Sequence, residues 1–372
     1  MRIVQYRPIF VFICIITFVI LFVQVKYTNY TREKRICIES EELFKETKDV
    51  PTQQHLDNIA VTGASVLQAK YSDLNSNISF FNDVNSGFQN RPIITLFTSF
   101  KTDHGMDSEK VLVYNNTLYN WQTLRAHVQL MFFTLETSAA DKVKFIEWNI
   151  VPISHHSETG IPILKAMYVQ ANKLYNTSWY GYFNGDILLT EDILETLEYV
   201  SSVSDKFPNA SILIIGRRIN VLNVTSEEVR KINGIKEIAR SRGSLYEIDA
   251  EDYFITNRFF PWEKIPEFVI GRAGYDNWIV GHARCDLGTI VIDATETLTA
   301  VHQTTSKGGN KEGFAHGNKN YNFELIQRLK LTKRFLQGLT TCAEWRTFRT
   351  LNSGRVELVK RDDLHKNCKC KK

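Results

Sequence analysis

The chain contains 372 residues, of which 43% are hydrophobic, 12% aromatic and 23% charged. This is the composition of a globular protein, and it excludes a wholly disordered, collagen-like or low-complexity chain. With 45 Lys and Arg against 41 Asp and Glu, the formal net charge is +4. Six cysteines are too few for a small disulfide-dense scaffold, and the length allows one large domain or two small ones.

The excess positive charge lies at the two ends of the chain. Residues 1–35 carry a net charge of +5 and residues 346–372 carry +6, whereas residues 36–345 carry −7. Because domains that bind nucleic acid are basic, the acidic central part argues against a nucleic-acid partner. The last 27 residues are therefore interpreted as a basic C-terminal tail, at residues 346–372.

An apolar segment near the N-terminus predicts a membrane anchor. Residues 8–25 read PIFVFICIITFVILFVQV, and as a helix they would span about 27 Å, close to the ~30 Å hydrocarbon core of a bilayer. A cleaved signal peptide is the alternative, but the run is long and no small-x-small cleavage site follows it. We predict a transmembrane signal-anchor at residues 8–25, preceded by a cytosolic tail at residues 1–7.

Basic residues flank this segment on both sides, so their distribution does not set its orientation. The chain contains six Asn-x-Ser/Thr sequons, which begin at Asn29, Asn77, Asn115, Asn176, Asn209 and Asn223. Together with five cysteines outside the anchor and the very short N-terminal stub, the sequons favour a lumenal body. We expect a single-pass type II protein of the Golgi or ER membrane.

Two regions follow the anchor. Residues 26–90 show no clear periodicity and are interpreted as a stem, whereas from residue 92 onward apolar runs alternate with helical patterns. The runs lie at residues 93–97, 128–133, 179–189 and 211–215, and the helical patterns at residues 116–125 and 162–174. This alternation predicts an α/β domain with a mostly parallel central sheet over residues 91–345. Ligands of such sheets bind at the carboxyl ends of the strands.

The first candidate site is the segment Phe-Asn-Gly-Asp-Ile-Leu-Leu at residues 183–189. Gly185 lets the backbone turn, so that Asn184 and Asp186 can both reach one divalent ion. Amide and carboxylate oxygens suit Mg²⁺ or Mn²⁺, which also bind substrate phosphates. The alternative interpretation is a common Asn-Gly-Asp turn at the end of a strand.

Residues 93–98, 160–171 and 183–189 together resemble the GT-A fold of glycosyltransferases. The resemblance implies a single GT-A-like domain in which an Asp-x-Asp motif chelates Mn²⁺ or Mg²⁺ on a nucleotide-sugar donor. Asp186 matches the second acidic position of that motif, whereas Asn184 departs from the first. No dinucleotide-binding, Walker, zincin or hydrolase nucleophile motif occurs, which argues against those enzyme classes.

The second candidate is Asp276, which lies in the segment Gly-Arg-Ala-Gly-Tyr-Asp-Asn-Trp at residues 271–278. Burial and a nearby Arg can tune a single carboxylate as a general base, and Trp262, Tyr275 and Trp278 are candidate faces for sugar stacking. The alternative is an aromatic core strip in which Asp276 caps a helix over residues 277–283. The resemblance implies that Asp276 is the base that deprotonates the acceptor.

Further candidates are single residues at predicted strand ends or in loops. His302 precedes a Gly-Gly segment that contains Lys307, and Arg217 and Arg218 directly follow a predicted strand. An imidazole is a common metal ligand and two guanidinium groups can bind phosphate, but a lone histidine and a solvated Arg pair explain the same pattern. The resemblance implies that His302 is a further metal ligand. It also implies that Thr98 and Lys165 line the nucleotide pocket and that Arg218 or Lys307 contacts phosphate.

These observations predict a type II membrane glycosyltransferase that moves a sugar from a nucleotide-sugar donor to a hydroxyl of a glycan, glycoprotein or glycolipid. Asn184 motivates the alternative of a membrane-anchored GT-A-like pseudoenzyme or carbohydrate-binding protein. A third interpretation is a secreted ligand-binding domain behind a cleaved signal peptide. Cys342 is one conceivable disulfide partner of Cys368 or Cys370, but spacing alone does not fix the connectivity.

Overall fold

The computed structural model describes residues 91–100, 108–135, 148–305, 318–362 and 364–370. They belong to a compact unit that runs from Gln89 to Lys372. The predicted cytosolic tail, membrane anchor and stem, at residues 1–90, lie outside the described residues, and so does Lys307. Within the described ranges, no helix is both long and apolar enough to cross a bilayer.

A nine-stranded sheet forms the centre of the described unit, with the order β13-β12-β10-β6-β9-β4-β1-β2-β3. Its strands are β1 (Ile94–Thr98), β2 (Val128–Thr134), β3 (Asn149–Pro152), β4 (Trp179–Phe183), β6 (Ile212–Ile215), β9 (Tyr253–Asn257), β10 (Ile290–Asp293), β12 (Trp345–Arg349) and β13 (Val356–Lys360). Neighbouring strands pair in parallel except where β9 or β13 takes part. The predicted α/β class with a mostly parallel sheet is therefore confirmed.

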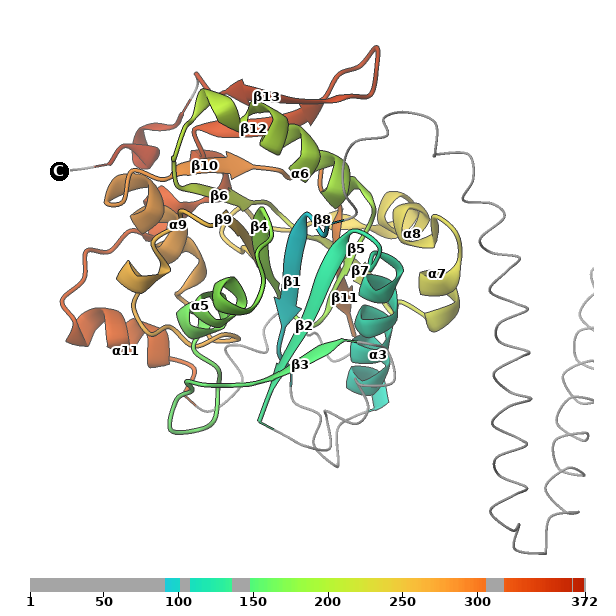
Figure 1. Cartoon of the computed structure of the whole chain (residues 1–372), viewed down its shortest axis with the longest axis horizontal. Coiled ribbons are helices and arrows are strands. Elements are labelled where there is room, and N and C mark those ends of the chain that lie inside the picture. Colours follow the sequence, from blue (N-terminus) through green and yellow to red (C-terminus); the bar gives the residue numbers. More distant parts are fainter. Residues whose placement is uncertain (1–90, 101–107, 136–147, 306–317, 363, 371–372) are drawn as a thin grey trace, which may run out of the picture. The chain divides into compact units, whose positions relative to one another are not determined.

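Helices cover both faces of this sheet (Figure 1). One apolar cluster joins the sheet to α5 (Leu164–Leu174), α9 (Asp276–Cys285) and α11 (Tyr321–Arg328). The other joins it to α3 (Ser108–Thr123) and α6 (Asp192–Val203). Side chains alternate along a strand, so a strand that is buried on both faces must be apolar throughout, as β1 is at most positions.

A second sheet of four strands, in the order β5-β11-β7-β8, lies next to α3 and α8 (Figure 1). Its strands are β5 (Ile187–Leu189), β7 (Ile219–Leu222), β8 (Ser244–Leu245) and β11 (Ala300–Thr304), and α7 (Ser226–Arg230) and α8 (Gly234–Arg242) pack on it. The sequence pattern over residues 179–189 predicted one strand. The structure divides it at Asn184–Asp186, so that β4 and β5 belong to different sheets.

The segment after residue 345 is folded onto the same unit rather than separate from it. Strands β12 and β13 extend the central sheet, and disulfides join Cys285 to Cys370 and Cys342 to Cys368. The predicted domain boundary at 345 therefore falls on the first residue of β12. Short 3-10 helices complete the unit at Ser204–Lys206 (η2), Trp262–Lys264 (η3), Phe335–Gly338 (η5), Thr340–Cys342 (η6) and Lys366–Cys368 (η7).

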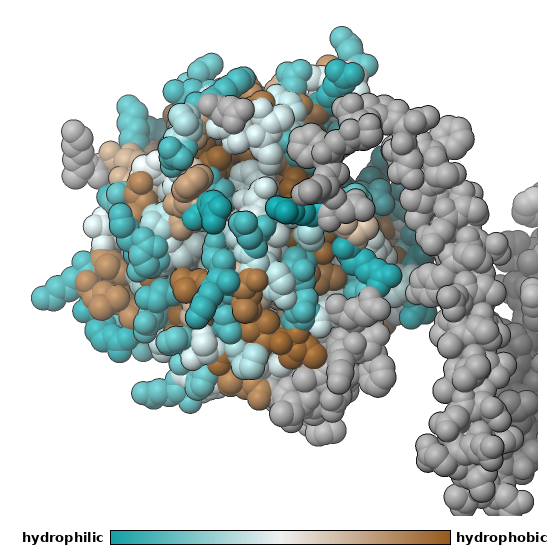
Figure 2. Space-filling view, viewed as in Figure 1, coloured by the Kyte–Doolittle hydropathy of each residue, from teal (hydrophilic) through white to brown (hydrophobic). Residues whose placement is uncertain are grey.

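The described surface mixes polar and apolar side chains. Val169 and Leu174 on α5 are about half exposed, and hydrophobic residues on the face in Figure 2 form separate patches between hydrophilic ones. Scattered apolar residues of this kind are normal for a protein surface.

Candidate functional site

The break between β4 and β5 places Asp186 beside His302. The antiparallel pairing of β5 with β11 sets His302 opposite Ile187, the residue after Asp186. The Nε2 atom of His302 lies 3.1 Å from Oδ2 of Asp186, and the Nδ1 atom lies 3.2 Å from the hydroxyl of Thr304. His302 is almost fully buried. Two residues that are far apart in sequence, and that were predicted as metal ligands, are thus brought into contact.

Polar side chains on the buried face of α3 hold this break in place. Trp121 Nε1 donates to the carbonyl of Ile187 at 2.9 Å. Asn120 donates to the carbonyl of Leu189 at 2.9 Å and accepts from its N–H at 2.7 Å. These bonds satisfy backbone groups of the short strand β5, which would otherwise be buried without partners. The helix therefore supports the position of Asp186.

Both polar atoms of the Asn184 side-chain amide form hydrogen bonds. Its Oδ1 atom accepts from the hydroxyl of Tyr182 at 3.0 Å, and its Nδ2 atom donates to Asp252 at 2.6 Å. The backbone N–H of Asn184 also donates to the carbonyl of Asp252 at 3.0 Å. An aspartate at position 184 would set two carboxylates against each other here. The pairing with Asp252 thus gives a physical reason for the departure from the Asp-x-Asp pattern.

Asp252 is the main site residue that the sequence analysis missed. It lies immediately before β9, which pairs antiparallel with β4, and it forms a buried ion pair of 2.5 Å with Arg218. Arg218 also donates to Asn220 at 3.0 Å and its guanidinium lies 4.1 Å from the ring centre of Tyr246. The predicted phosphate-binding Arg218 is therefore held by protein partners. The acidic pair Glu251-Asp252 in front of an apolar run was the signal available in the sequence.

The electrostatic surroundings keep Asp186 ionised. Burial by itself would raise the pKa of Asp186, but His302 and Arg218 outweigh it, so that its pKa lies below the ordinary value. An ionised carboxylate and an imidazole at one point are ligands that a divalent cation can use.

The residues at this point fit a divalent cation. The Oδ1 atom of Asp186 is buried and has no hydrogen-bond partner among the described residues. The 3.1 Å contact between Oδ2 of Asp186 and Nε2 of His302 is a hydrogen bond, and both atoms are of types that a divalent cation binds. The described residues contain no group of three His, Cys, Asp or Glu that could hold a metal. The remaining ligands would therefore be water or phosphate, the pattern typical of Mg²⁺.

Asp276 stands in different surroundings. It is the first residue of α9, which has Tyr275 as its N-cap, so the interpretation of Asp276 as a helix cap is wrong. Burial raises its pKa to about 7, and the charges of Asp252 and Asp249 add to the shift, whereas the N–H of Asn277 opposes it. A carboxylate with this pKa is suited to general-base chemistry at neutral pH.

The aromatic residues around Asp276 belong to the core. Trp262 and Trp278 are almost fully buried; Trp262 stacks on Tyr168 at 3.7 Å between ring centres, and Trp278 stacks on His282 at 4.5 Å. The expectation that they offer faces for sugar stacking is therefore wrong, because their faces are occupied by neighbouring side chains.

The remaining predicted residues are placed separately. Thr98 is fully buried at the carboxyl end of β1, and its hydroxyl has no hydrogen-bond partner among the described residues. Lys165 lies on α5 and pairs with Glu267 at 3.5 Å, and nothing in the described contacts joins it to Asp186 or Asp276.

No family model matches the chain, and no curated protein matches it significantly in sequence. Among solved structures, S. aureus TarS 1–349 in complex with UDP-GlcNAc is similar at 10% identity and a TM-score of 0.34, over 63% of this chain and 65% of that chain. A second structure of S. aureus TarS is similar at 11% identity and a TM-score of 0.22, over 34% of this chain and 22% of that chain. At these TM-scores the two likenesses assign neither a fold family nor a function.

Proposed function

We propose that the chain is a glycosyltransferase that moves a sugar from a nucleotide-sugar donor to a hydroxyl acceptor with the help of Mn²⁺ or Mg²⁺. The observation that carries the proposal is the contact of Asp186 with His302, 3.1 Å apart at the break between β4 and β5, where Oδ1 of Asp186 has no hydrogen-bond partner among the described residues. Asp276, whose pKa burial raises to about 7, is suited to exchange a proton at neutral pH.

In the proposed reaction, the two carboxylates have separate tasks. Asp186 and His302 would hold the cation, with Asn184 beside them, and a bound divalent ion supplies positive charge next to the leaving diphosphate. Asp276 takes the proton of the acceptor hydroxyl while that oxygen bonds to the anomeric carbon. The bond from this carbon to the diphosphate oxygen breaks, and the diphosphate leaves with the electron pair. This assignment corresponds to inversion at the anomeric carbon.

The proposed compartment is the lumen of the Golgi or ER, with the chain anchored as a type II membrane protein. Two disulfides in the described residues suit an oxidising compartment. The sequon residues Asn176, Asn209 and Asn223 are all exposed, as attachment of a glycan requires. Glycan, glycoprotein or glycolipid acceptors would be encountered there.

The test uses the purified full chain with a panel of nucleotide sugars, with and without Mn²⁺, and measures release of nucleoside diphosphate. We expect metal-dependent release with at least one donor and its loss in Asp186→Ala. Glu296→Gln is the matched control, because this exposed carboxylate pairs, among the described residues, with Arg346 at 3.5 Å. Equal background rates for wild type and Asp186→Ala across the panel would remove the enzyme proposal.

The same samples separate the alternative of a pseudoenzyme or carbohydrate-binding protein. Binding of Mn²⁺ is followed by electron paramagnetic resonance, and binding of the nucleotide sugars by calorimetry. Saturable donor binding without turnover would favour the binding protein. We expect Asp186→Ala and His302→Ala to weaken Mn²⁺ binding, whereas Glu296→Gln should leave it unchanged.

A further inference from the structure

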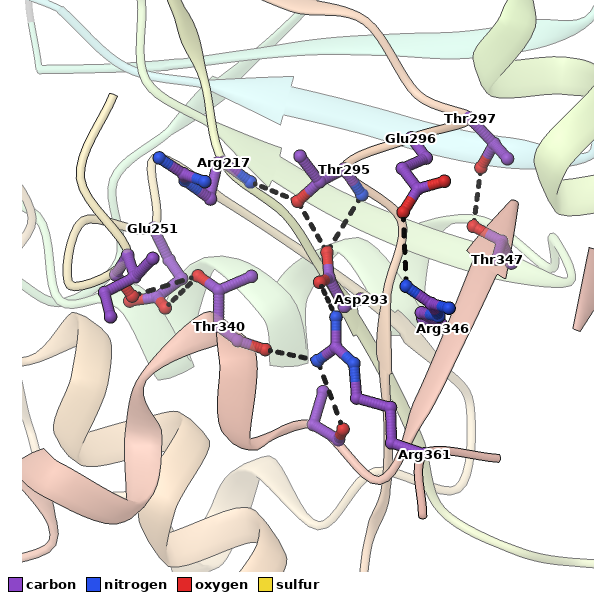
Figure 3. A network of polar contacts seen from close by, with 12 residues as sticks. Arg217, Glu251, Asp293, Thr295, Glu296, Thr297, Thr340, Arg346, Thr347 and Arg361 are labelled. Carbon is purple, nitrogen blue, oxygen red and sulfur yellow. Dashed lines mark hydrogen bonds and ion pairs between the residues drawn. The ribbon is translucent and has the colours of Figure 1, made fainter. Parts of the chain in front are cut away.

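A second network of polar contacts includes Arg217, Glu251, Asp293, Thr295, Thr340 and Arg361 (Figure 3), and Asn277 is bonded to it through Glu251. Three of its members are chain neighbours of site residues. Arg217 precedes Arg218, Glu251 precedes Asp252, and Asn277 follows Asp276. None of the three was singled out for the proposed reaction. Peptide bonds therefore join the network to Arg218, Asp252 and Asp276.

Glu251 is the buried centre of the network near Asp276. Only 2% of its surface is exposed, and both of its carboxylate oxygens accept hydrogen bonds. Oε1 accepts from the hydroxyl of Thr340 at 2.8 Å, and Oε2 accepts from Nδ2 of Asn277 at 3.0 Å. Since Asn277 lies in the first turn of α9, Glu251 ties this turn to the segment before β9.

The same turn is also held from a second side. A Cβ atom placed on Gly338 would lie 1.7 Å from the carbonyl oxygen of Asn277. Only glycine allows the backbone of η5 to approach the helix so closely. The first turn of α9 is therefore fixed between the side chain of Glu251 and the backbone at Gly338.

The C-terminal segment completes the network. Arg361, which follows β13, donates to Oδ2 of Asp293 at 2.6 Å and to the carbonyl of Thr340 at 3.2 Å. The other oxygen of Asp293 accepts from Thr295, and the hydroxyl of Thr295 accepts from the N–H of Arg217 at 2.9 Å. Figure 3 shows that Arg361 joins two sets of contacts, one through Thr340 to Glu251 and the other through Asp293 and Thr295 to Arg217.

We propose that Glu251 is a positioning residue for Asp276: through Asn277 it holds the first turn of α9, so that Asp276 keeps its half-buried place among neighbouring carboxylates. This inference rests on the proposed function, in which Asp276 deprotonates the acceptor. Glu251 itself touches neither the donor nor the acceptor, so its effect on the reaction passes through Asp276.

The charged and titratable groups around Asp276 make its position measurable. Asp249, Glu251 and Asp252 face it from the segment before β9, with Tyr275 on its own helix, and Arg218 pairs with Asp252. Because burial is the largest cause of the raised pKa of Asp276, a looser turn that admits water lowers this pKa. The pH dependence of the reaction therefore reports the position of the carboxylate.

The first experiment compares two asparagine variants of the full chain. Asn277→Ala removes the hydrogen bond that Asn277 donates to Glu251. We expect kcat to fall roughly 10- to 100-fold. We also expect the acidic midpoint of the pH profile of kcat to move down by roughly one pH unit. Asn257→Ala is the matched control, because Asn257 bonds to Ala210 and Ile212 at the other end of β9. It should lower stability without moving the midpoint. An unchanged midpoint in Asn277→Ala would overturn the proposal.

The second experiment separates hydrogen bonding from charge at Glu251. Glu251→Ala should behave like Asn277→Ala. Glu251→Gln should keep the wild-type profile, because its oxygen can accept from Asn277 and its nitrogen can donate to Thr340, whose hydroxyl then donates to the carbonyl of Ile248. If Glu251→Gln moves the midpoint as far as Glu251→Ala, Glu251 acts through its charge and the positioning role is wrong.

A readout without turnover keeps this inference distinct from the proposed function. Carbodiimide coupling requires a protonated carboxyl group, so the pH dependence of coupling at Asp276, followed by peptide mass spectrometry, gives its pKa directly. We expect a midpoint near 7 in the wild type and a lower midpoint in Asn277→Ala and Glu251→Ala. This result without any donor turnover would leave the positioning of Asp276 standing and remove only the glycosyltransferase proposal.

Discussion

The surroundings of Asp186 and Asp276 are opposite in sign, although both carboxylates interact with the Arg218–Asp252 pair: Arg218 lowers the pKa of Asp186, and Asp252 raises the pKa of Asp276. Burial raises the pKa of Asp186, but the hydrogen bond and electrostatic interaction with His302 and the charge of Arg218 bring it below the ordinary value. Around Asp276 the neighbours are Asp249, Glu251 and Asp252, and its pKa rises to about 7. Burial acts on both carboxylates in the same direction, so the sign of the neighbouring charge decides which one stays ionised.

The comparison shows why one edge of a sheet can hold two carboxylates with different tasks. A group that stays ionised can bind a cation, and a group that titrates near neutral pH can exchange a proton. Asp252 takes part in both environments, because Arg218 and Asn184 bind its two oxygens and its charge raises the pKa of Asp276. Four predictions test this contrast, from the largest expected effect to the smallest.

The largest effect is expected when the titrating carboxylate is removed. Asp276→Asn keeps the size of the side chain but cannot accept the acceptor proton, so kcat should fall by about 10²- to 10⁴-fold. Asp249→Asn is the control, since this exposed residue only adds its charge to the raised pKa of Asp276. Its kcat should stay within a few-fold of wild type. A fall in Asp249→Asn as large as that in Asp276→Asn would contradict the assignment.

The next effect concerns the cationic side of the comparison. Arg218→Met leaves Asp252 as a buried carboxylate without its cation, and we expect the free energy of unfolding to fall by about 3–5 kcal/mol. Arg346→Met breaks an exposed pair with Glu296 and should cost at most about 1 kcal/mol. Urea titration of both variants measures the difference. Equal losses of unfolding free energy in the two variants would mean that the buried Arg218–Asp252 pair contributes no more to stability than the exposed pair.

The pH dependence of stability should differ in sign between the two carboxylates. The folded pKa of Asp276 is raised, so its stabilising contribution is complete below the unfolded pKa of about 4 and is lost as the pH rises through about 7. The folded pKa of Asp186 is lowered, so its contribution is present above about pH 4 and is lost only in more acidic solution.

Thermal unfolding of wild type and Asp276→Asn between pH 4 and 8 measures the first contribution. Wild type should lose roughly 1–2 kcal/mol relative to the variant, after allowance for the partial exposure of the side chain. Parallel curves for the two proteins would show that the pKa of Asp276 is not raised in solution.

The smallest effect is expected at Thr98. Its buried hydroxyl has no hydrogen-bond partner among the described residues, so Thr98→Val should change the free energy of unfolding by no more than about 0.5 kcal/mol. If this hydroxyl contacts the nucleotide, the KM for the donor should nevertheless rise a few-fold. Thr297→Val is the contrasting control, because Thr297 shares a buried 2.6 Å hydrogen bond with Thr347 and should lose stability instead. A loss of several kcal/mol in Thr98→Val would show that its hydroxyl has a structural partner.

Local patterns in the sequence were sufficient for much of the sheet. The apolar runs at residues 93–97, 128–133 and 211–215 became β1, β2 and β6, because strands buried on both faces are apolar throughout. Strand β9 was missed, although residues 253–255 are also apolar. It runs antiparallel between β4 and β6, a pairing between distant segments that no local pattern specifies.

In the candidate site, too, some residues could be predicted from the sequence and others could not. Asp186 and His302 were predicted from residue type and from their places after predicted strands, and Asp276 from its aromatic neighbours and a nearby Arg. Lys165 was expected beside them, but its ammonium pairs with Glu267 instead. Asp252 was missed because its role comes from contacts with Asn184 and Arg218, which lie far from it along the chain.

Composition and periodicity by themselves determined the α/β class, the acidic character of residues 36–345 and the residue types available for chemistry. Those properties follow from burial and side-chain chemistry, which act over a few neighbouring residues. Only the tertiary structure decided that Asp186 faces His302 and Arg218 while Asp276 faces carboxylates, and that the segment after residue 345 joins the sheet. Electrostatic interactions and strand pairing depend on distance in space, and the fold alone brings distant segments within that distance.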